Sequence, residues 1–229
     1  MAGRSHLFGL GVFGGSNGFW RASALKAVKM DESMLTEDID SSIRAMLAGY
    51  RIGYSPHIIS SELSPLTLTT LQKQRLRWAQ GWFQVSFKHM IPVLMSKQVT
   101  IGQKIGCVFL LAWREVFAYL ILHPIMLIII SAARSHLVVT ELYLAMGGVI
   151  FALGISRTIV AYKLAQGPAR HNIGRFILFA VVQIIWSVYM NYVQVLSHAR
   201  EMLQMHTWTA TVREQLVTVQ TEIVVVMPV

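Results

Sequence analysis

The second half of the chain is dominated by long apolar stretches that are separated by short polar segments. Each stretch is close to the roughly 20 residues that a helix needs to cross about 30 Å of hydrocarbon. Each therefore predicts a membrane-spanning helix, and residues 105–113 are compatible with a longer, tilted first span. The predicted spans are 116–133, 137–155 and 176–196.

The basic residues between these stretches predict the topology. Residues 157–175 include Arg157, Lys163, Arg170 and Arg175 and no acidic residue. Because cytoplasmic loops carry an excess of Lys and Arg, this loop is expected in the cytoplasm. Residues 1–65 then also face the cytoplasm, and an odd number of spans leaves residues 201–229 on the opposite side. The expected protein is a multi-pass protein of the plasma membrane or another cellular membrane.

The first 65 residues have the character of a soluble domain that mixes strands and helices. Residues 8–13 and 51–54 have the composition of strands, and the former run into a glycine-rich turn. Residues 20–29 predict a short helix. A longer helix is expected from Thr36, which can cap it, to residue 47, with Gly49 as its stop signal. This mixture predicts an α/β segment.

Residues 68–96 have the pattern of a basic, aromatic, amphipathic helix. At 100° per residue, one face collects Leu71, Trp78, Trp82 and Val85. The charges of Lys73, Arg77 and Lys88 lie away from that face. Such a pattern is typical of a helix that lies along a membrane surface.

Composition agrees with a membrane protein and argues against a nucleic-acid partner. Hydrophobic residues make up 54% of the 229 positions and charged residues 14%, and the mean hydropathy is +0.52. The net charge of +9 is concentrated at the borders of apolar stretches, as in membrane flanks. No zinc-type Cys/His spacing or RNA-binding aromatic signature occurs, so we expect no nucleic-acid partner. The single cysteine, Cys107, lies in an apolar stretch and is expected to pack as a small hydrophobe.

Two short strings carry candidate chemistry. The first is Thr36-Glu37-Asp38, in which a carboxylate could accept a proton from a hydroxyl group; the alternative is an ordinary acidic first turn of a helix. The second is Gln74-x-x-Arg77-Trp78, whose three side chains share one helix face. Arg offers a fork to a diphosphate and Trp a flat surface to a sugar, whereas the alternative is anchoring at a membrane boundary.

The glycine-rich turn that begins at Gly14 is a weaker candidate. Glycines permit close approach of a ligand to the backbone, so Ser16 and Asn17 are candidate contacts for a ligand. Glycine turns are common, so this string alone does not distinguish binding from simple chain reversal.

The order and spacing of these strings, followed by apolar spans, resembles the C-terminal half of processive family-2 glycosyltransferases. This family includes the cellulose, chitin and hyaluronan synthases. The resemblance implies the C-terminal part of an α/β GT-A-type domain at residues 1–65 and an interfacial helix at 66–98. It further implies an α-helical membrane bundle at 99–200 and a tail at 201–229.

The resemblance also implies a role for each candidate residue. Asp38 would be the catalytic base with Glu37 as its charged neighbour, and Thr36 would belong to the same binding site. Arg77 would hold the pyrophosphate of a UDP- or GDP-sugar donor, Trp78 would stack near the glycan acceptor, and Gln74 would fix their setting. Ser16 and Asn17 would lie beside the acceptor's terminal sugar. The lipid bilayer is the third expected partner.

The family's nucleotide-binding half, which supplies the ligands of a divalent metal (Mg or Mn), would precede Phe13. Nothing in residues 1–12 resembles it. The expectation is therefore a fragment, a truncated gene model or a degenerate relative that would not turn over alone. Two alternatives of other classes remain: a non-catalytic multi-pass protein, either a pseudoenzyme or a channel or scaffold, and a membrane-surface binding module that uses residues 68–96.

Overall fold

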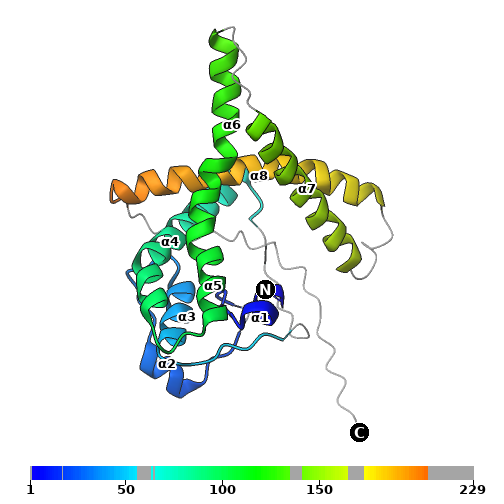
Figure 1. The fold of residues 1–229 in the computed structure, drawn as a ribbon. Helices are drawn as coiled ribbons and strands as arrows, with labels where there is room; N and C mark the ends of the chain where they lie inside the picture. The colour runs from blue at the N-terminus through cyan, green and yellow to red at the C-terminus, as the bar shows by residue number, and fades with distance from the viewer. Residues whose placement is uncertain are drawn as a thin grey trace, which may run out of the picture.

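A computed structural model describes residues 2–16, 18–55, 63, 65–134, 141–164 and 173–205, and its regular elements in these ranges are all helices (Figure 1). Helices α5, η1 and α6 follow one another without a break, and η1 is a π-helical stretch within that run. The elements are α1 (Ala2–Phe8), α2 (Ala22–Val28), α3 (Glu37–Leu47), α4 (Leu68–Met95), α5 (Ile101–Cys107), η1 (Val108–Trp113), α6 (Arg114–Arg134), α7 (Glu141–Leu164) and α8 (Ile173–Met202).

The two strands expected from the sequence are not formed in the described residues, so the α/β prediction is not confirmed there. Phe8 ends α1, and residues 9–13 and 51–55 lack regular secondary structure. The two segments nevertheless lie side by side, because a Cβ added to Gly11 would collide with the carbonyl oxygen of Ile52. A strand pair without further strands is marginal in water, which explains why proximity alone produces no sheet here.

Helix α3 begins and ends where the sequence predicts. Its first turn carries acidic residues, which the helix dipole favours. Its end is a Schellman motif, in which Tyr50 N–H donates to the Ala45 carbonyl and Gly49 N–H to the Met46 carbonyl. Gly49 has a φ of +84°, which glycine adopts without strain. Thr36 occupies the N-cap position but makes no side-chain capping bond, so that part of the prediction is wrong.

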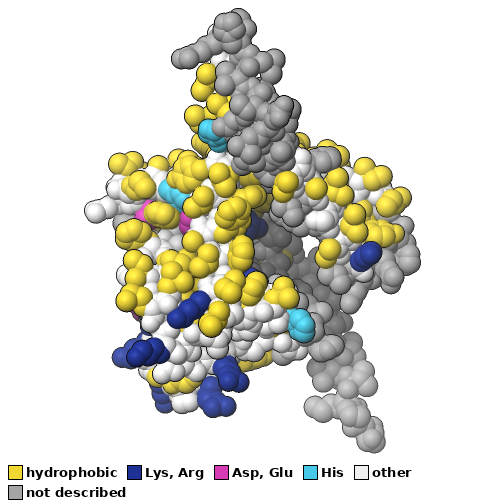
Figure 2. Space-filling view, in the orientation of Figure 1, with side chains coloured by type: hydrophobic (Ala, Val, Ile, Leu, Met, Phe, Trp, Pro, Cys, Tyr) yellow, Lys and Arg dark blue, Asp and Glu magenta, His cyan; other side chains and the backbone are white. Residues whose placement is uncertain are grey.

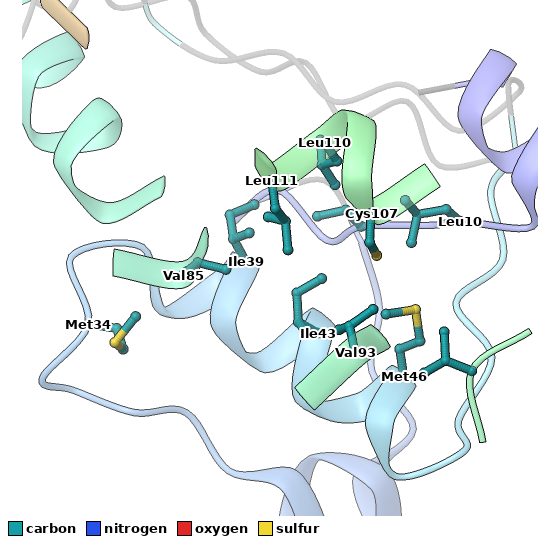
Figure 3. Close-up of a cluster of buried hydrophobic side chains, with 12 residues drawn as sticks. Leu10, Met34, Ile39, Ile43, Met46, Val85, Val93, Cys107, Leu110 and Leu111 are labelled. Carbon is teal, nitrogen blue, oxygen red and sulfur yellow. The ribbon is translucent and has the colours of Figure 1, made fainter. Parts of the chain in front are cut away.

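The core lies between α3, the middle of α4 and the α5–η1 segment (Figure 3). Ile39, Ile43 and Met46 follow the spacing of one helix face and point into this core. Across from them lie Val85 and Val93 of α4, both fully buried. The α5–η1 segment contributes Cys107, Leu110 and Leu111, so the cysteine packs as a small hydrophobe, as predicted.

Helix α4 is a single long helix over almost the whole range predicted as amphipathic. It contacts α3, α5, η1 and α8, which makes it the central element of the described structure. Its side away from the core exposes large apolar side chains, among them Phe87, Ile91 and Met95. This is not the face predicted from the sequence, because Val85 is fully buried and Trp82 packs against the core.

A buried polar network fastens α6 to α8. The Glu115 carboxylate lies 2.6 Å from His198 Nε2, accepts a hydrogen bond from the Gln194 amide, and forms an ion pair with Arg114 at 2.8 Å. Tyr119 Oη lies 2.7 Å from the other ring nitrogen of His198. Each of these groups is thereby paired, which offsets the cost of removing it from water.

Helices are found at all three predicted spans, but only two described helical segments are long and apolar enough to cross a membrane. These are Ile101–His123, which runs through α5, η1 and the start of α6, and Ile173–Met202, which is α8. Helix α7 contains a shorter apolar stretch, Gly147–Val160. The predicted span 116–133 overlaps the first segment only in part, and the alternative of a longer first span that includes residues 105–113 agrees better with its extent.

The structure does not support the predicted placement of residues 201–229 across the membrane from residues 1–65; residues 206–229 lie outside the described residues. Glu201, near the end of α8, is hydrogen-bonded to Gln80 and Gln84 of α4. Helix α4 in turn packs on α3, so the end of α8 lies beside the soluble segment. Figure 2 shows that Lys and Arg side chains on this face gather mainly at the end of the molecule that holds α1 to α3, whereas α6 and α8 present apolar side chains.

Candidate functional site

The Thr36-Glu37-Asp38 turn and the Arg77 side chain meet at the contact between α3 and α4. Arg77 Nη1 donates a hydrogen bond of 3.2 Å to the carbonyl oxygen of Leu35, the residue directly before the turn. Its Nε is buried and has no hydrogen-bond partner among the described residues. The guanidinium is therefore anchored through Nη1, and its buried Nε–H remains unpaired among the described residues.

A glycine in α4 allows this close contact. Gly81 faces Thr36, and a Cβ at position 81 would lie 2.6 Å from the Thr36 methyl carbon and 2.9 Å from its backbone nitrogen. Thr36 is only 6% exposed, and its hydroxyl has no partner among the described residues. Thr36 thus packs the turn against α4, and this placement does not present its side chain to a ligand.

Asp38 lies in the first turn of α3 and is partly buried. Burial is the main cause that raises the pKa of its carboxyl group, and the neighbouring charge of Glu37 raises it further. The Ile39 N–H, which donates to Asp38 Oδ1 at 2.8 Å, and the charge of Arg77 both oppose this rise. The net effect is a raised pKa, which makes the ionised carboxylate a better proton acceptor than an ordinary surface aspartate.

The glycine-rich loop lies directly against this carboxylate. A Cβ at Gly15, whose φ is +81°, would sit 3.5 Å from Asp38 Oδ2. Ser42 Oγ fastens the loop to α3, because it accepts from Phe13 N–H at 2.9 Å and donates to the Asp38 carbonyl at 2.8 Å. Ser16 follows Gly15 and is exposed, whereas Asn17 lies outside the described residues.

The other two residues of the second string, Gln74 and Trp78, lie within one helical turn of Arg77 in α4. Arg75 stacks its guanidinium over one face of Trp78, 4.6 Å from the ring centroid, and also lies 5.9 Å from the Trp186 ring of α8. Trp78 is partly exposed, as is Gln74 one turn before it. No bond joins Gln74 to Arg77 or Trp78 in the described part of the chain. The structure therefore does not show that Gln74 holds these two side chains in position.

A buried cluster of charged groups, which the sequence analysis did not identify, is centred on Asp40, two residues after Asp38. Asp40 is fully buried and is held by Arg44 at 2.6 Å, His89 at 2.7 Å and Lys88 at 3.1 Å. Burial alone would raise the pKa of Asp40, but hydrogen bonds from its three partners outweigh burial and lower the pKa to about 2. At neutral pH this carboxylate is ionised, and it joins α3 to α4 through His89 and Lys88. His89 is therefore a core histidine whose ring is paired with a carboxylate.

The described residues do not offer a site for the divalent metal that the family resemblance implies. No group of three or more His, Cys, Asp or Glu side chains is arranged for metal binding in the ranges that the structure describes. Asp38-Ile39-Asp40 has D-x-D spacing, but residues two apart point to different sides of a helix. Asp40 is committed to Arg44, Lys88 and His89, so the two carboxylates do not form a pair of ligands.

Comparison with known proteins identifies a family over most of the chain. The sequence model described as "Glycosyl transferase family group 2" matches residues 5–156. The match includes the glycine-rich loop, Asp38, Arg77 and the helices as far as the middle of α7. No solved structure gives a significant match.

Curated relatives match over a shorter region. A poly-beta-1,6-N-acetyl-D-glucosamine synthase of Staphylococcus epidermidis is 39% identical over 83 residues, which cover 36% of this chain and 20% of the relative. The protein of the same name from Staphylococcus aureus is 38% identical over 80 residues, 35% of this chain and 19% of the relative. The matched region thus spans about a fifth of the length of these relatives.

Proposed function

The chain belongs to glycosyl transferase family group 2. From this premise we propose that it takes part, at a membrane, in the transfer of a sugar from a nucleotide-sugar donor to a growing β-linked glycan. The observation that carries the proposal is the meeting of three elements at one point. These are the Asp38 carboxylate, the glycine-rich loop against it, and Arg77 at the base of the same turn. A proton acceptor and an anion-binding group are what this reaction requires of a protein.

The similarity to poly-beta-1,6-N-acetyl-D-glucosamine synthases supports N-acetylglucosamine as the sugar and a polymer as the product. We therefore propose a UDP- or GDP-activated N-acetylglucosamine as donor and a β-linked chain of the same sugar as acceptor. The apolar helices α6 and α8 support a bilayer as the setting and a passage for the product through it.

Asp38 takes the proton of the acceptor hydroxyl as that oxygen forms a bond to the donor's anomeric carbon. The bond from that carbon to the diphosphate breaks at the same time, and the nucleoside diphosphate leaves with the bonding electron pair. Arg77 stabilises the diphosphate through its remaining N–H groups. Trp78 offers its ring to the acceptor sugar, and Gln74, Ser16 and Asn17 contribute polar contacts around it.

The proposal is tested with membranes that contain the protein expressed from its gene together with its natural flanking sequence. Incorporation of labelled N-acetylglucosamine into polymer is measured beside donor affinity. Asp38→Asn should lower turnover on the order of 10²–10⁴-fold with donor affinity nearly unchanged, because the lost group acts on the acceptor proton. Arg77→Ala should weaken donor affinity as well as rate, and Trp78→Ala should chiefly weaken use of the acceptor.

Near-normal turnover in Asp38→Asn would contradict its role as base and favour the view that the acidic string is only a helix turn. A folded wild-type protein that transfers no sugar from any nucleotide donor would instead support the non-catalytic alternative, a membrane scaffold or pseudoenzyme. Retained membrane binding in an inactive Asp38→Asn variant would argue against a simple membrane-surface binding module.

A further inference from the structure

The backbone of Leu35, directly before the Thr36-Glu37-Asp38 turn, is held at both of its polar groups by side chains of α4. Its N–H donates to Gln84 Oε1 at 3.1 Å, and its carbonyl accepts from Arg77 Nη1 at 3.2 Å. Residues 77 and 84 are seven apart and share one face of the helix. The position of the turn relative to α4 is therefore set by two side chains and not only by apolar packing.

Gln84 extends this connection to the end of α8. Its amide nitrogen lies 3.2 Å and 3.1 Å from the two carboxylate oxygens of Glu201. A carboxylate can only accept, so the Gln84 NH₂ group must face Glu201 and its carbonyl oxygen must face Leu35 N–H. The chemistry of the neighbours thus fixes the orientation of the amide.

Gln80 makes a parallel contact that does not reach the turn. Its amide nitrogen donates to Glu201 at 2.9 Å and to the Met205 carbonyl at 3.2 Å. Both glutamines therefore bind α8 to α4, but in the bonds described here only Gln84 also contacts Leu35. This difference provides a matched control within one helix.

We propose that Glu201, acting through Gln84, is a positioning residue for the transfer reaction. Through this contact, the end of α8 fixes the position of the Asp38 turn relative to α4. The inference rests on the proposed function. Hydrogen bonds to a charged group are roughly twice as strong as neutral ones, so Glu201 holds the Gln84 amide firmly. A displacement of about 1 Å at a reacting group can cost on the order of 10² in rate, so release of this amide should be visible in kcat.

An exchange of the two side chains tests the connection. Gln84→Glu alone places a second carboxylate against Glu201 and should lower kcat about tenfold or more, with little change in donor KM. The double variant Gln84→Glu with Glu201→Gln can remake both bonds, since one carboxylate oxygen accepts from Leu35 N–H and the other from the new amide. We expect it to recover most of the lost kcat. Gln80→Met, which leaves the connection to Leu35 intact, should retain near wild-type kcat.

Two further readouts separate positioning from general stability. The thermal unfolding midpoint of each variant is measured in detergent beside its kinetics, and Glu201→Ala is combined with Asp38→Asn. If Glu201 acts through Asp38, its removal should add no further loss in the Asp38→Asn background. A purely structural role would lower the rate in both backgrounds by the same factor.

The inference is overturned if the exchange variant recovers nothing, or if Gln80→Met loses as much kcat as Gln84→Glu. It is also overturned if wild-type protein is active and the Gln84 and Glu201 variants leave kcat unchanged, an outcome that leaves the proposed function standing. A wild-type protein without transferase activity overturns the proposed function, and this inference falls with it.

Discussion

At the scale of single residues, the environment of Asp38 determines what the proposed site can do. Its carboxyl group is partly buried at the start of α3, which is the largest cause of its raised pKa, and Glu37 adds to the rise. A general base works best when its pKa lies nearer to the working pH, provided that it remains ionised there. Burial therefore favours Asp38 as a base over the fully exposed carboxylate that an ordinary first helical turn would present.

The raised pKa predicts the acid side of the pH–rate profile. Turnover should fall as pH decreases through the pKa of Asp38, at a pH above the ordinary aspartate value of 3.8. Glu37→Gln removes a charge that raises this pKa, so the fall should move to lower pH while activity persists. The measurement is kcat against pH for wild type, Glu37→Gln and Asp38→Asn; identical acid limbs in all three would exclude Asp38 as the titrating group.

The same shift has a consequence for stability that serves as the control. Because the folded-state pKa of Asp38 is raised, the native state binds more protons than the unfolded state between the two pKa values. Its contribution to stability therefore decreases as pH rises through that window and is unfavourable at neutral pH. Asp38→Asn should unfold at a temperature equal to or higher than wild type at pH 7, so that its inactivity cannot be attributed to unfolding.

The sequence identified Asp38 and Arg77 because each belongs to a short string of recognisable chemistry. It gave no sign of Gln84 and Glu201, which are 117 residues apart. Periodicity records which face of a helix is apolar, but not which distant polar group a glutamine meets. The Asp40–His89 bond was missed for the same reason: it spans 49 residues and no local spacing signals it.

At the scale of elements, the contact between α3 and α4 depends on Gly81. Ala is the better helix former by about 1 kcal/mol, so propensity alone predicts that Gly81→Ala stabilises α4. Packing predicts the opposite, since the added carbon would lie 2.9 Å from the Thr36 backbone nitrogen and the turn would have to move. We expect Gly81→Ala to lower turnover strongly without abolishing folding. Turnover and thermal unfolding are measured together.

Gly154→Ala in α7 is the matched control, because a Cβ there meets nothing within 4 Å among the described residues. It should leave turnover unchanged. If Gly81→Ala were as active as Gly154→Ala, close contact between the Asp38 turn and α4 would not be needed for transfer.

Helices were predictable from the sequence where their signals are local. Apolar periodicity and the stop at Gly49 placed α3 and α4 to within a few residues. Strands are not a local property, because a strand needs a neighbour to accept its hydrogen bonds. In the described part of the chain, Gly11 lies close to Ile52, but the two segments form no sheet. The network around Glu115 could not be predicted from the sequence either, because it joins α6 to α8 through side chains about 80 residues apart.

At the scale of the whole molecule, the contact between α8 and α4 determines topology more directly than counting spans does. The charge rule assigns sides to loops, but the side of the C-terminal end depends on whether the number of crossings is odd or even. Hydrogen bonds from Gln80 and Gln84 hold Glu201 beside the soluble segment. Two arrangements satisfy this contact. In the first, the segment Ile101–His123 and α8 cross the membrane. In the second, α6 and α7 cross as a hairpin and α8 lies along the membrane surface.

We therefore predict that the end of α8 and residues 1–55 face the same side of the membrane. Cys107 is fully buried, so single cysteines introduced elsewhere can be labelled in intact cells against little background. Glu32→Cys and Leu203→Cys occupy exposed positions and should react from the same side. Ser135→Cys, beyond α6, should react from the opposite side and confirm that the reagent discriminates.

Lys163→Cys then distinguishes the two arrangements. Labelling from the same side as Glu32→Cys indicates that α8 lies along the surface, and labelling from the same side as Ser135→Cys indicates that α8 crosses. Labelling of Glu32→Cys and Leu203→Cys from opposite sides would contradict the Glu201 contact and, with it, the route by which α8 reaches the Asp38 turn.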